Sequence, residues 1–159
     1  MDLQYLKVLE EYKINEKELP EDAKNGIKEI KNALRLAKLR ESKGMLANSG
    51  INSAGSFFMN PVISKDDAVL LPEGAPKWQQ ADGAIKTSAA WLIEQAGFTK
   101  GYSRGNAGIS SKHVLALVNN GGASAMSIVE LAMEIRDTVR NKFGIALQPE
   151  VQLSGIKFI

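Results

Sequence analysis

The sequence predicts an α+β fold: a small mixed or antiparallel sheet with packed helices, preceded by an N-terminal helical hairpin. The first 43 residues carry 19 of the 38 charged side chains but only one of the 14 glycines. The remainder holds every phenylalanine and tryptophan and nearly all the turn residues. In that remainder, segments with helical periodicity are interleaved with short apolar runs that suit strands, and short links join them. This arrangement is typical of an α+β domain. We therefore expect a helical extension over residues 1–43 and a compact domain over residues 44–159.

Two helices are expected in the extension. Residues 3–14 read as a short helix, and Leu19-Pro20-Glu21-Asp22 suits the start of a second, because proline and acids favour a first helical turn. The second helix is expected to run to about Ser42, on an apolar stripe at three- and four-residue spacing: Ala23, Ile27, Ile30, Leu34 and Ala37. The basic residues on its other faces, Lys24, Lys28, Lys31 and Arg35, are interpreted as a solvated surface.

Two further helices are expected in the second part. Thr87 or Ser88 can cap a helix that ends near Gly97, and Ser124 or Ser127 can cap the clearest helix of the chain, ended by Gly144. Residues 66–76 are expected to form a loop or a short irregular helix. Strands are expected over residues 56–64, 113–118 and 150–153, where short apolar runs are bounded by turn residues.

The composition excludes several classes of site. The chain has no cysteine and one histidine, which excludes disulfides, thiolate metal sites and cysteine nucleophiles and argues against a histidine metal site. The net charge of +2 gives no reason to expect a nucleic acid or a membrane surface as a partner. The first residues lack the pattern of a signal peptide, so the expected location is the cytoplasm.

Polar residues inside apolar runs are the main candidates for a site. Gly55-Ser56-Phe57-Phe58-Met59-Asn60-Pro61-Val62 places a hydroxyl and a carboxamide four residues apart, and buried polar groups need partners. Glu150 stands in a similar setting, and an acid beside Ser56 would orient its hydroxyl as a proton donor. The alternatives stay open: Ser56 bonded to backbone, Asn60 as a turn residue and Glu150 as a solvated acid.

Three further candidates each have a structural alternative. Lys43 closes a helix where a cation favours the dipole. Trp78 can stack on a base or sugar, or cover the edge of the core. His113 begins an apolar run, where a structural histidine is the commoner case. The stretch from Lys100 to Gly108 is neither a P-loop nor a dinucleotide-binding loop, because neither glycine pattern is present.

As an ordered set, these residues resemble the C-terminal, substrate-binding domain of the UDP-N-acetylenolpyruvoylglucosamine reductase family. The similarity extends over about residues 38–155. It is carried by Ser42-Lys43, residues 53–62, residues 80–98, residues 109–119, Phe143-Gly144-Ile145 and Pro149-Glu150-Val151. The segments Ala54-Gly55-Ser56-Phe57-Phe58 and Ala90-Trp91-Leu92-Ile93-Glu94-Gln95-Ala96-Gly97 are its most specific parts.

The resemblance implies an activity and roles for single residues. The family reduces UDP-N-acetylglucosamine enolpyruvate to UDP-N-acetylmuramate in bacterial peptidoglycan synthesis, with FAD and NADPH. Ser56 matches the serine that protonates the enol intermediate, and Glu150 matches the glutamate that assists it. Lys43 and Asn60 match residues that bind the sugar nucleotide. Trp78 and His113 fall where the family has an aromatic and a polar side chain near the substrate.

The departures from the family pattern limit this activity. The flavin-binding domains that precede this region in the family have no counterpart in the first ~37 residues, and Met59 stands where many members have lysine. No cofactor is therefore expected on this chain, a separate FAD-binding domain is an expected partner, and the chain alone is expected to be inactive. Two alternatives remain: a non-catalytic UDP-sugar-binding module, or a helical interaction or scaffold protein with a vestigial site.

Overall fold

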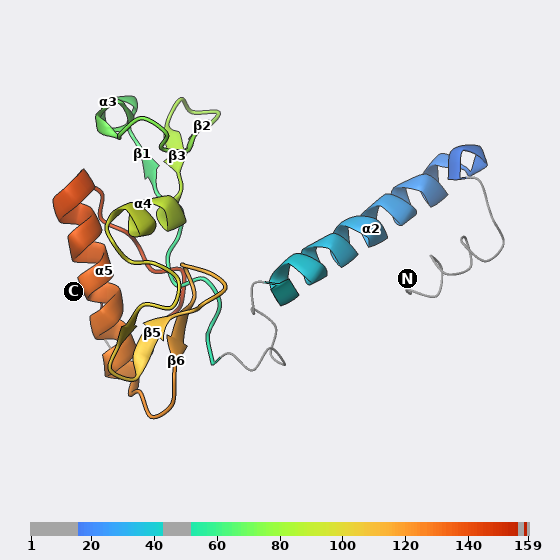
Figure 1. The fold of residues 1–159 in the computed structure, drawn as a ribbon. Helices are drawn as coiled ribbons and strands as arrows, with labels where there is room; N and C mark the ends of the chain where they lie inside the picture. Colours follow the sequence, from blue (N-terminus) through green and yellow to red (C-terminus); the bar gives the residue numbers. More distant parts are fainter. Residues whose placement is uncertain (1–15, 43–51, 156–157, 159) are drawn as a thin grey trace. The chain divides into compact units, whose positions relative to one another are not determined.

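A computed structural model describes residues 16–42, 52–155 and 158 of the chain (Figure 1). The chain divides into two compact units, Met1–Lys43 and Gly44–Ile159. The first helix of the predicted hairpin, over residues 3–14, lies outside the described residues.

The described part of the first unit is almost entirely one helix. A 3₁₀ turn, η1 (Glu16–Glu18), precedes α2 (Glu21–Ser42). The helix starts with Glu21 and Asp22 in its first turn, where acids oppose the positive end of the helix dipole. Both predicted ends of this helix are confirmed. No helix in the described ranges is long and apolar enough to cross a membrane.

Three helices of the second unit begin at serine caps. They are α3 (Lys65–Leu70), α4 (Ala89–Gln95) and α5 (Ala125–Phe143). The hydroxyls of Ser64, Ser88 and Ser124 each accept a hydrogen bond from a backbone N–H three residues later. Gly144 ends α5 in the left-handed conformation, with φ of 73°. The expected caps of α4 and α5 and the glycine stop of α5 are thus confirmed.

The strands form two separate antiparallel sheets of three strands. One has the order β1-β3-β2, built from β1 (Val62–Ile63), β2 (Lys77–Gln79) and β3 (Ile85–Thr87). The other has the order β4-β5-β6, built from β4 (Ser103–Arg104), β5 (Ala107–Ile109) and β6 (Leu117–Asn119). The predicted α+β class is confirmed, and the strands divide between two sheets.

Three predicted strands differ from the structure. Within residues 56–64, Ser56 and Phe58 make single bridges and only Val62–Ile63 is a strand. The strand predicted over residues 113–118 begins only at Leu117. The strand predicted over residues 150–153 is wrong: pairing stops at Pro149, and bends follow. Proline has no N–H to donate, so it favours the end of a ladder.

The core of the second unit lies between α5, α4 and the second sheet. α5 packs against β5, β6 and α4, as Figure 1 shows. Leu131, Ile135 and Val139 of α5 are fully buried and share one face of the helix. Phe58 is 1% exposed and belongs to the same cluster. The chain segment that carries Ser56 is therefore anchored directly in the core.

Candidate functional site

The segment from Ser56 to Met59 runs between two other stretches of chain. On one side Ser56 bridges Ala116, and the Phe57 N–H donates to the Leu115 carbonyl at 2.8 Å. On the other side the Glu150 N–H donates to the Phe57 carbonyl at 2.7 Å, and the Met59 N–H donates to the Gln148 carbonyl at 3.0 Å. Backbone pairing thus brings Glu150 beside the segment of Ser56, although the two residues are far apart in sequence.

The Ser56 hydroxyl makes no hydrogen bond to any described residue, and its side chain is only partly buried. The observed Ser56 side chain therefore differs from the alternative in which its hydroxyl forms a hydrogen bond with the backbone. Phe58 pairs with Pro149, so a regular ladder would set Ser56 opposite Val151 and Glu150 opposite Phe57. Ser56 and Glu150 are thus not directly opposite each other but are offset by one position along the paired segments. Glu150 is exposed, and no hydrogen bond joins its carboxylate to Ser56 within the described residues.

A hollow lies next to the paired segments that carry Ser56 and Glu150. Gly55 and Phe57, on either side of Ser56, line a hollow of about 410 Å³ together with Val151, the neighbour of Glu150. Leu117 and Ile128 supply more of its apolar wall. Its volume falls within the usual range for small-molecule sites, and apolar walls with few polar groups are typical of them. The neighbours of Ser56 and Glu150 line this space, whereas Ser56 and Glu150 themselves are not among its lining residues.

Asn60 has a structural role that the sequence did not reveal. Its side-chain oxygen accepts a hydrogen bond from the Ala89 N–H at 2.9 Å, at the first residue of α4. The next residue, Pro61, accepts the Thr87 N–H at 2.9 Å. One lone pair of the oxygen is thus engaged, and the N–H₂ group of Asn60 remains able to donate to a ligand.

Trp78 and His113 lie on elements other than the Ser56 segment. Trp78 lies on β2, 49% exposed, and β3 separates β2 from β1. At ordinary strand spacing it is about 10 Å from β1. The His113 Nδ1 accepts the Leu115 N–H at 3.2 Å, so this ring shapes the turn before the segment that pairs with Ser56. Lys43 lies outside the described residues.

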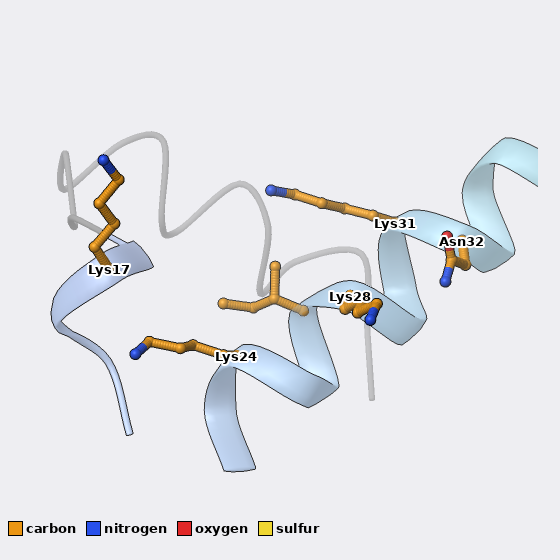
Figure 2. A pocket seen from close by; sticks show the side chains of 6 residues that line it. Lys17, Lys24, Lys28, Lys31 and Asn32 are labelled. Atoms are coloured by element: carbon orange, nitrogen blue, oxygen red, sulfur yellow. The ribbon is translucent and has the colours of Figure 1, made fainter. Parts of the chain in front are cut away.

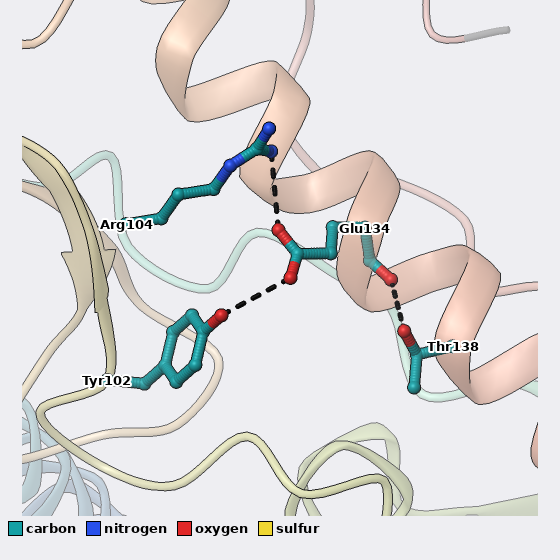
Figure 3. Close-up of polar contacts among 4 residues, drawn as sticks. All are labelled: Tyr102, Arg104, Glu134 and Thr138. Atoms are coloured by element: carbon teal, nitrogen blue, oxygen red, sulfur yellow. Dashed lines mark hydrogen bonds and ion pairs between the residues drawn. The ribbon is translucent and has the colours of Figure 1, made fainter.

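A polar cluster ties the second sheet to α5 (Figure 3). The Tyr102 hydroxyl donates to Glu134 at 3.2 Å, and Arg104 pairs with the other carboxylate oxygen of Glu134 at 3.2 Å. Burial, followed by the charge and hydrogen bond of Glu134, raises the pKa of Tyr102 above its ordinary value of 10.0, and Arg104 opposes this shift. Arg104 is therefore engaged with α5 through Glu134.

Alkaline stability tests the Tyr102 contact. Because the folded state raises the pKa of Tyr102, its contribution to stability is present below pH 10.0 and is lost as the pH rises through the folded-state value. Tyr102→Phe should therefore show a smaller loss of unfolding free energy above pH 10.0 than the parent chain. Urea unfolding at neutral and alkaline pH measures this difference. Glu134→Gln should also reduce the alkaline loss, and an unchanged loss in both variants would contradict the assignment.

Sequence comparison decides the family. The profile described as "UDP-N-acetylenolpyruvoylglucosamine reductase, C-terminal domain" matches residues 46–154. The chain belongs to this family. The UDP-N-acetylenolpyruvoylglucosamine reductase of Thermobifida fusca is 48% identical over 131 residues, which cover 74% of this chain and 37% of the relative. That of Cutibacterium acnes is 49% identical over 123 residues, covering 74% and 32%. That of Mycobacterium tuberculosis is 42% identical over 130 residues, covering 74% and 35%.

The comparisons confirm the resemblance inferred from the sequence. The chain spans about a third of the length of these UDP-N-acetylenolpyruvoylglucosamine reductases: 37%, 32% and 35% of the three relatives. The paired segments that carry Ser56, Ala116 and Glu150 all lie inside the residues that match the reductase domain.

The junction between β6 and α5 offers a test of flavin binding to this reductase domain. A glycine-containing loop between a strand and a helix holds dinucleotide phosphates in other folds through its N–H groups. Here the Asn119 side-chain oxygen accepts the N–H groups of Gly121 and Ala123 at 2.9 and 3.0 Å. The Ser124 hydroxyl accepts the Ser127 N–H at 3.0 Å. These three N–H groups are engaged within the protein and are therefore not available to the FAD diphosphate.

Sequence reasoning missed two features of this domain. The Tyr102–Arg104–Glu134 cluster joins a loop and a helix distant in sequence, and no local pattern predicts that pairing. The hollow beside Ser56 is built from separate segments, and its walls are ordinary aliphatic residues. The helix-cap role of Asn60 had a signal, since asparagine oxygens often bond to backbone N–H groups, although the partner is usually close in sequence.

Proposed function

We propose that this chain supplies the substrate-binding and proton-donating part of a flavin-dependent reductase. The proposed reaction converts UDP-N-acetylglucosamine enolpyruvate into UDP-N-acetylmuramate in bacterial peptidoglycan synthesis, in the cytoplasm. Family membership supports it, because the matched relatives are named UDP-N-acetylenolpyruvoylglucosamine reductases. The geometry adds one observation: the Ser56 hydroxyl has no hydrogen-bond partner among the described residues, and its segment pairs with that of Glu150 next to a hollow lined by Gly55, Phe57 and Val151.

The roles of the two residues follow from their chemistry. In the proposal, Ser56 gives its hydroxyl proton to the carbanionic carbon of the intermediate, Glu150 assists this transfer, and the serine oxygen regains a proton from solvent before the next turnover. The hydroxyl is free to turn toward a ligand, because no described residue holds it. Phe57 and Phe58 are 5% and 1% exposed, so they keep the backbone of Ser56 fixed while the side chain reacts.

Substrate binding is proposed for the remaining candidates. Asn60 would donate its N–H₂ group to an oxygen of the sugar nucleotide, and Lys43 would pair with its negative charge. Trp78 and His113 are proposed to contact other parts of the substrate, because both lie on elements other than the Ser56 segment. The hydride would come from FAD reduced by NADPH on a separate domain, and no cofactor is proposed for this chain.

A chimeric reductase tests this proposal. Residues 46–154 of this chain would replace the matched region of the Thermobifida fusca reductase. The chimera should consume NADPH in the presence of UDP-N-acetylglucosamine enolpyruvate and release UDP-N-acetylmuramate. A flavin-containing chimera that binds substrate without making product would instead support a non-catalytic UDP-sugar-binding module. A flavin-containing chimera that neither binds nor turns over would contradict the proposal.

Two variants of Asn60 separate its structural role from its proposed binding role. Asn60→Asp keeps an oxygen for the Ala89 N–H but removes the N–H₂ donors. We expect it to fold with nearly the parent's stability and to lose affinity for UDP-N-acetylglucosamine enolpyruvate by about 10-fold, as for one lost hydrogen bond. Asn60→Ala should in addition lower the unfolding free energy by about 1 kcal/mol.

Urea unfolding and calorimetric titration measure the two effects. Asn32→Asp, on the exposed surface of α2, is the matched control and should change neither quantity. If Asn60→Asp binds as tightly as the parent, Asn60 serves only to hold the start of α4.

A further inference from the structure

One side of the hollow next to the Ser56 segment is a run of four consecutive residues: Val151, Gln152, Leu153 and Ser154. We call residues 151–154 the wall. Backbone pairing between this part of the chain and the Ser56 segment ends at Pro149 and Glu150. Among the described residues, no backbone hydrogen bond holds the wall itself. Its position therefore depends on the packing of side chains.

Few side chains of the wall are available for that packing. Val151 and Leu153 are partly buried and pack against the core, whereas Gln152 and Ser154 are exposed. The next described apolar residue along the chain is Phe158, which is also partly buried and packs against the same core. A third apolar contact thus follows the wall within a few residues.

The Phe158 ring is held from two directions. Its centroid lies 6.1 Å from that of Phe57 and 6.3 Å from that of Phe58. From α5, the guanidinium carbon of Arg136 lies 4.8 Å from the centroid of the Phe158 ring. The Arg136 side chain is only 15% exposed, and a cation over an aromatic face is attracted more strongly where water is excluded. Phe158 thus joins the chain beyond the wall both to α5 and to the Ser56 segment.

Phe57 connects this ring cluster with the hollow. Phe57 lines the hollow and also contacts Phe158, whereas Phe158 itself is not among the lining residues. We propose that Phe158 is a positioning residue of the substrate site: its ring, held by Arg136 and Phe57, keeps the wall in place beside the hollow. This inference rests on the proposed function, because it takes the hollow as part of the substrate site.

Thiol labelling of the full chain tests the position of the wall. The chain has no cysteine, so Leu153→Cys introduces the only thiol. Its rate of reaction with a coloured aromatic disulfide reports how often this side chain becomes accessible. Adding Phe158→Ala should raise that rate by at least about 10-fold, because the ring contacts and the contact with Arg136 are lost together. Phe158→Tyr keeps the ring and should restore the slow rate.

Two other single-cysteine variants separate movement of the wall from unfolding. Val139→Cys is buried in the core face of α5, and adding Phe158→Ala should raise its labelling rate far less than that of Leu153→Cys. An equal rise at the two positions would mean that Phe158 serves only the stability of the unit. Asn32→Cys, beside the separate hollow on α2 shown in Figure 2, should label at the same rate with and without Phe158→Ala.

Calorimetric titration with UDP-N-acetylglucosamine enolpyruvate connects the wall with the ligand. Phe158→Ala should bind at least about 10-fold more weakly than the parent chain, because a smaller fraction of molecules has the wall in place. Phe158→Tyr should bind like the parent.

The outcomes distinguish this inference from the proposed function. Unchanged affinity in Phe158→Ala, an unchanged labelling rate of Leu153→Cys, or an equal rise at residues 139 and 153 would overturn the positioning role of Phe158. Absence of binding by the parent chain would instead contradict the proposed function, and the labelling rates would still decide whether Phe158 holds the wall.

Discussion

Replacing Ser56 by alanine in the chimeric reductase is expected to lower turnover by about 10²–10⁴-fold, the usual contribution of a positioned proton donor. The variant removes only the hydroxyl, which has no described protein partner, so the fold should be unaffected. Flavin reduction by NADPH should survive, because it precedes the proposed protonation. Stopped-flow absorbance separates these two steps.

The control for Ser56 is another serine of the same unit. Ser103→Ala, at an exposed position on β4, should leave both steps unchanged. Full turnover in Ser56→Ala would remove Ser56 from the mechanism. Loss of flavin reduction in that variant would show that the serine acts earlier than proposed.

Replacing Phe58 by alanine is expected to lower the unfolding free energy of the second unit by about 3–5 kcal/mol. Phe58 is 1% exposed and packs edge-on against Phe57, with ring centroids 5.0 Å apart. Its ring also lies 6.3 Å from that of Phe158. Removing the ring leaves a cavity beneath the segment that carries Ser56, so ligand binding should weaken together with stability.

Tryptophan fluorescence in urea measures this loss. Both tryptophans, Trp78 and Trp91, lie in the second unit, so the signal reports that unit rather than α2. Val69→Ala is the matched control: Val69 is 78% exposed, and its loss should stay within about 0.5 kcal/mol. A change below about 1 kcal/mol in Phe58→Ala would contradict the position of Phe58 in the core.

The sequence predicted the helices better than the strands, because their signals are local. Ser88, Ser124 and Gly144 each act within one turn of the helix they bound, and all three were predicted. The strands are two or three residues long, too short for an alternating pattern to appear. Over residues 113–118, the turn closed by His113 replaces the first part of the expected strand.

The candidate site shows the same difference between local sequence signals and contacts between distant segments. The roles of Ser56 and Glu150 came from the family resemblance, while their pairing depends on backbone contacts between distant segments, which sequence spacing does not encode. The contact of Asn60 with α4 crosses 29 residues for the same reason. The roles of Ser56, Asn60 and Glu150 stay predictions until variants are measured.

The most direct measurement is calorimetric titration of the full chain with UDP-N-acetylglucosamine enolpyruvate. We expect saturable heat with a stoichiometry of one, with weaker binding in Asn60→Asp and unchanged binding in Asn32→Asp. Because the hollow and the Ser56 segment belong to this chain, binding should not require added flavin. The absence of heat at millimolar ligand, from a chain shown to be folded, would contradict the claim that this domain binds the substrate.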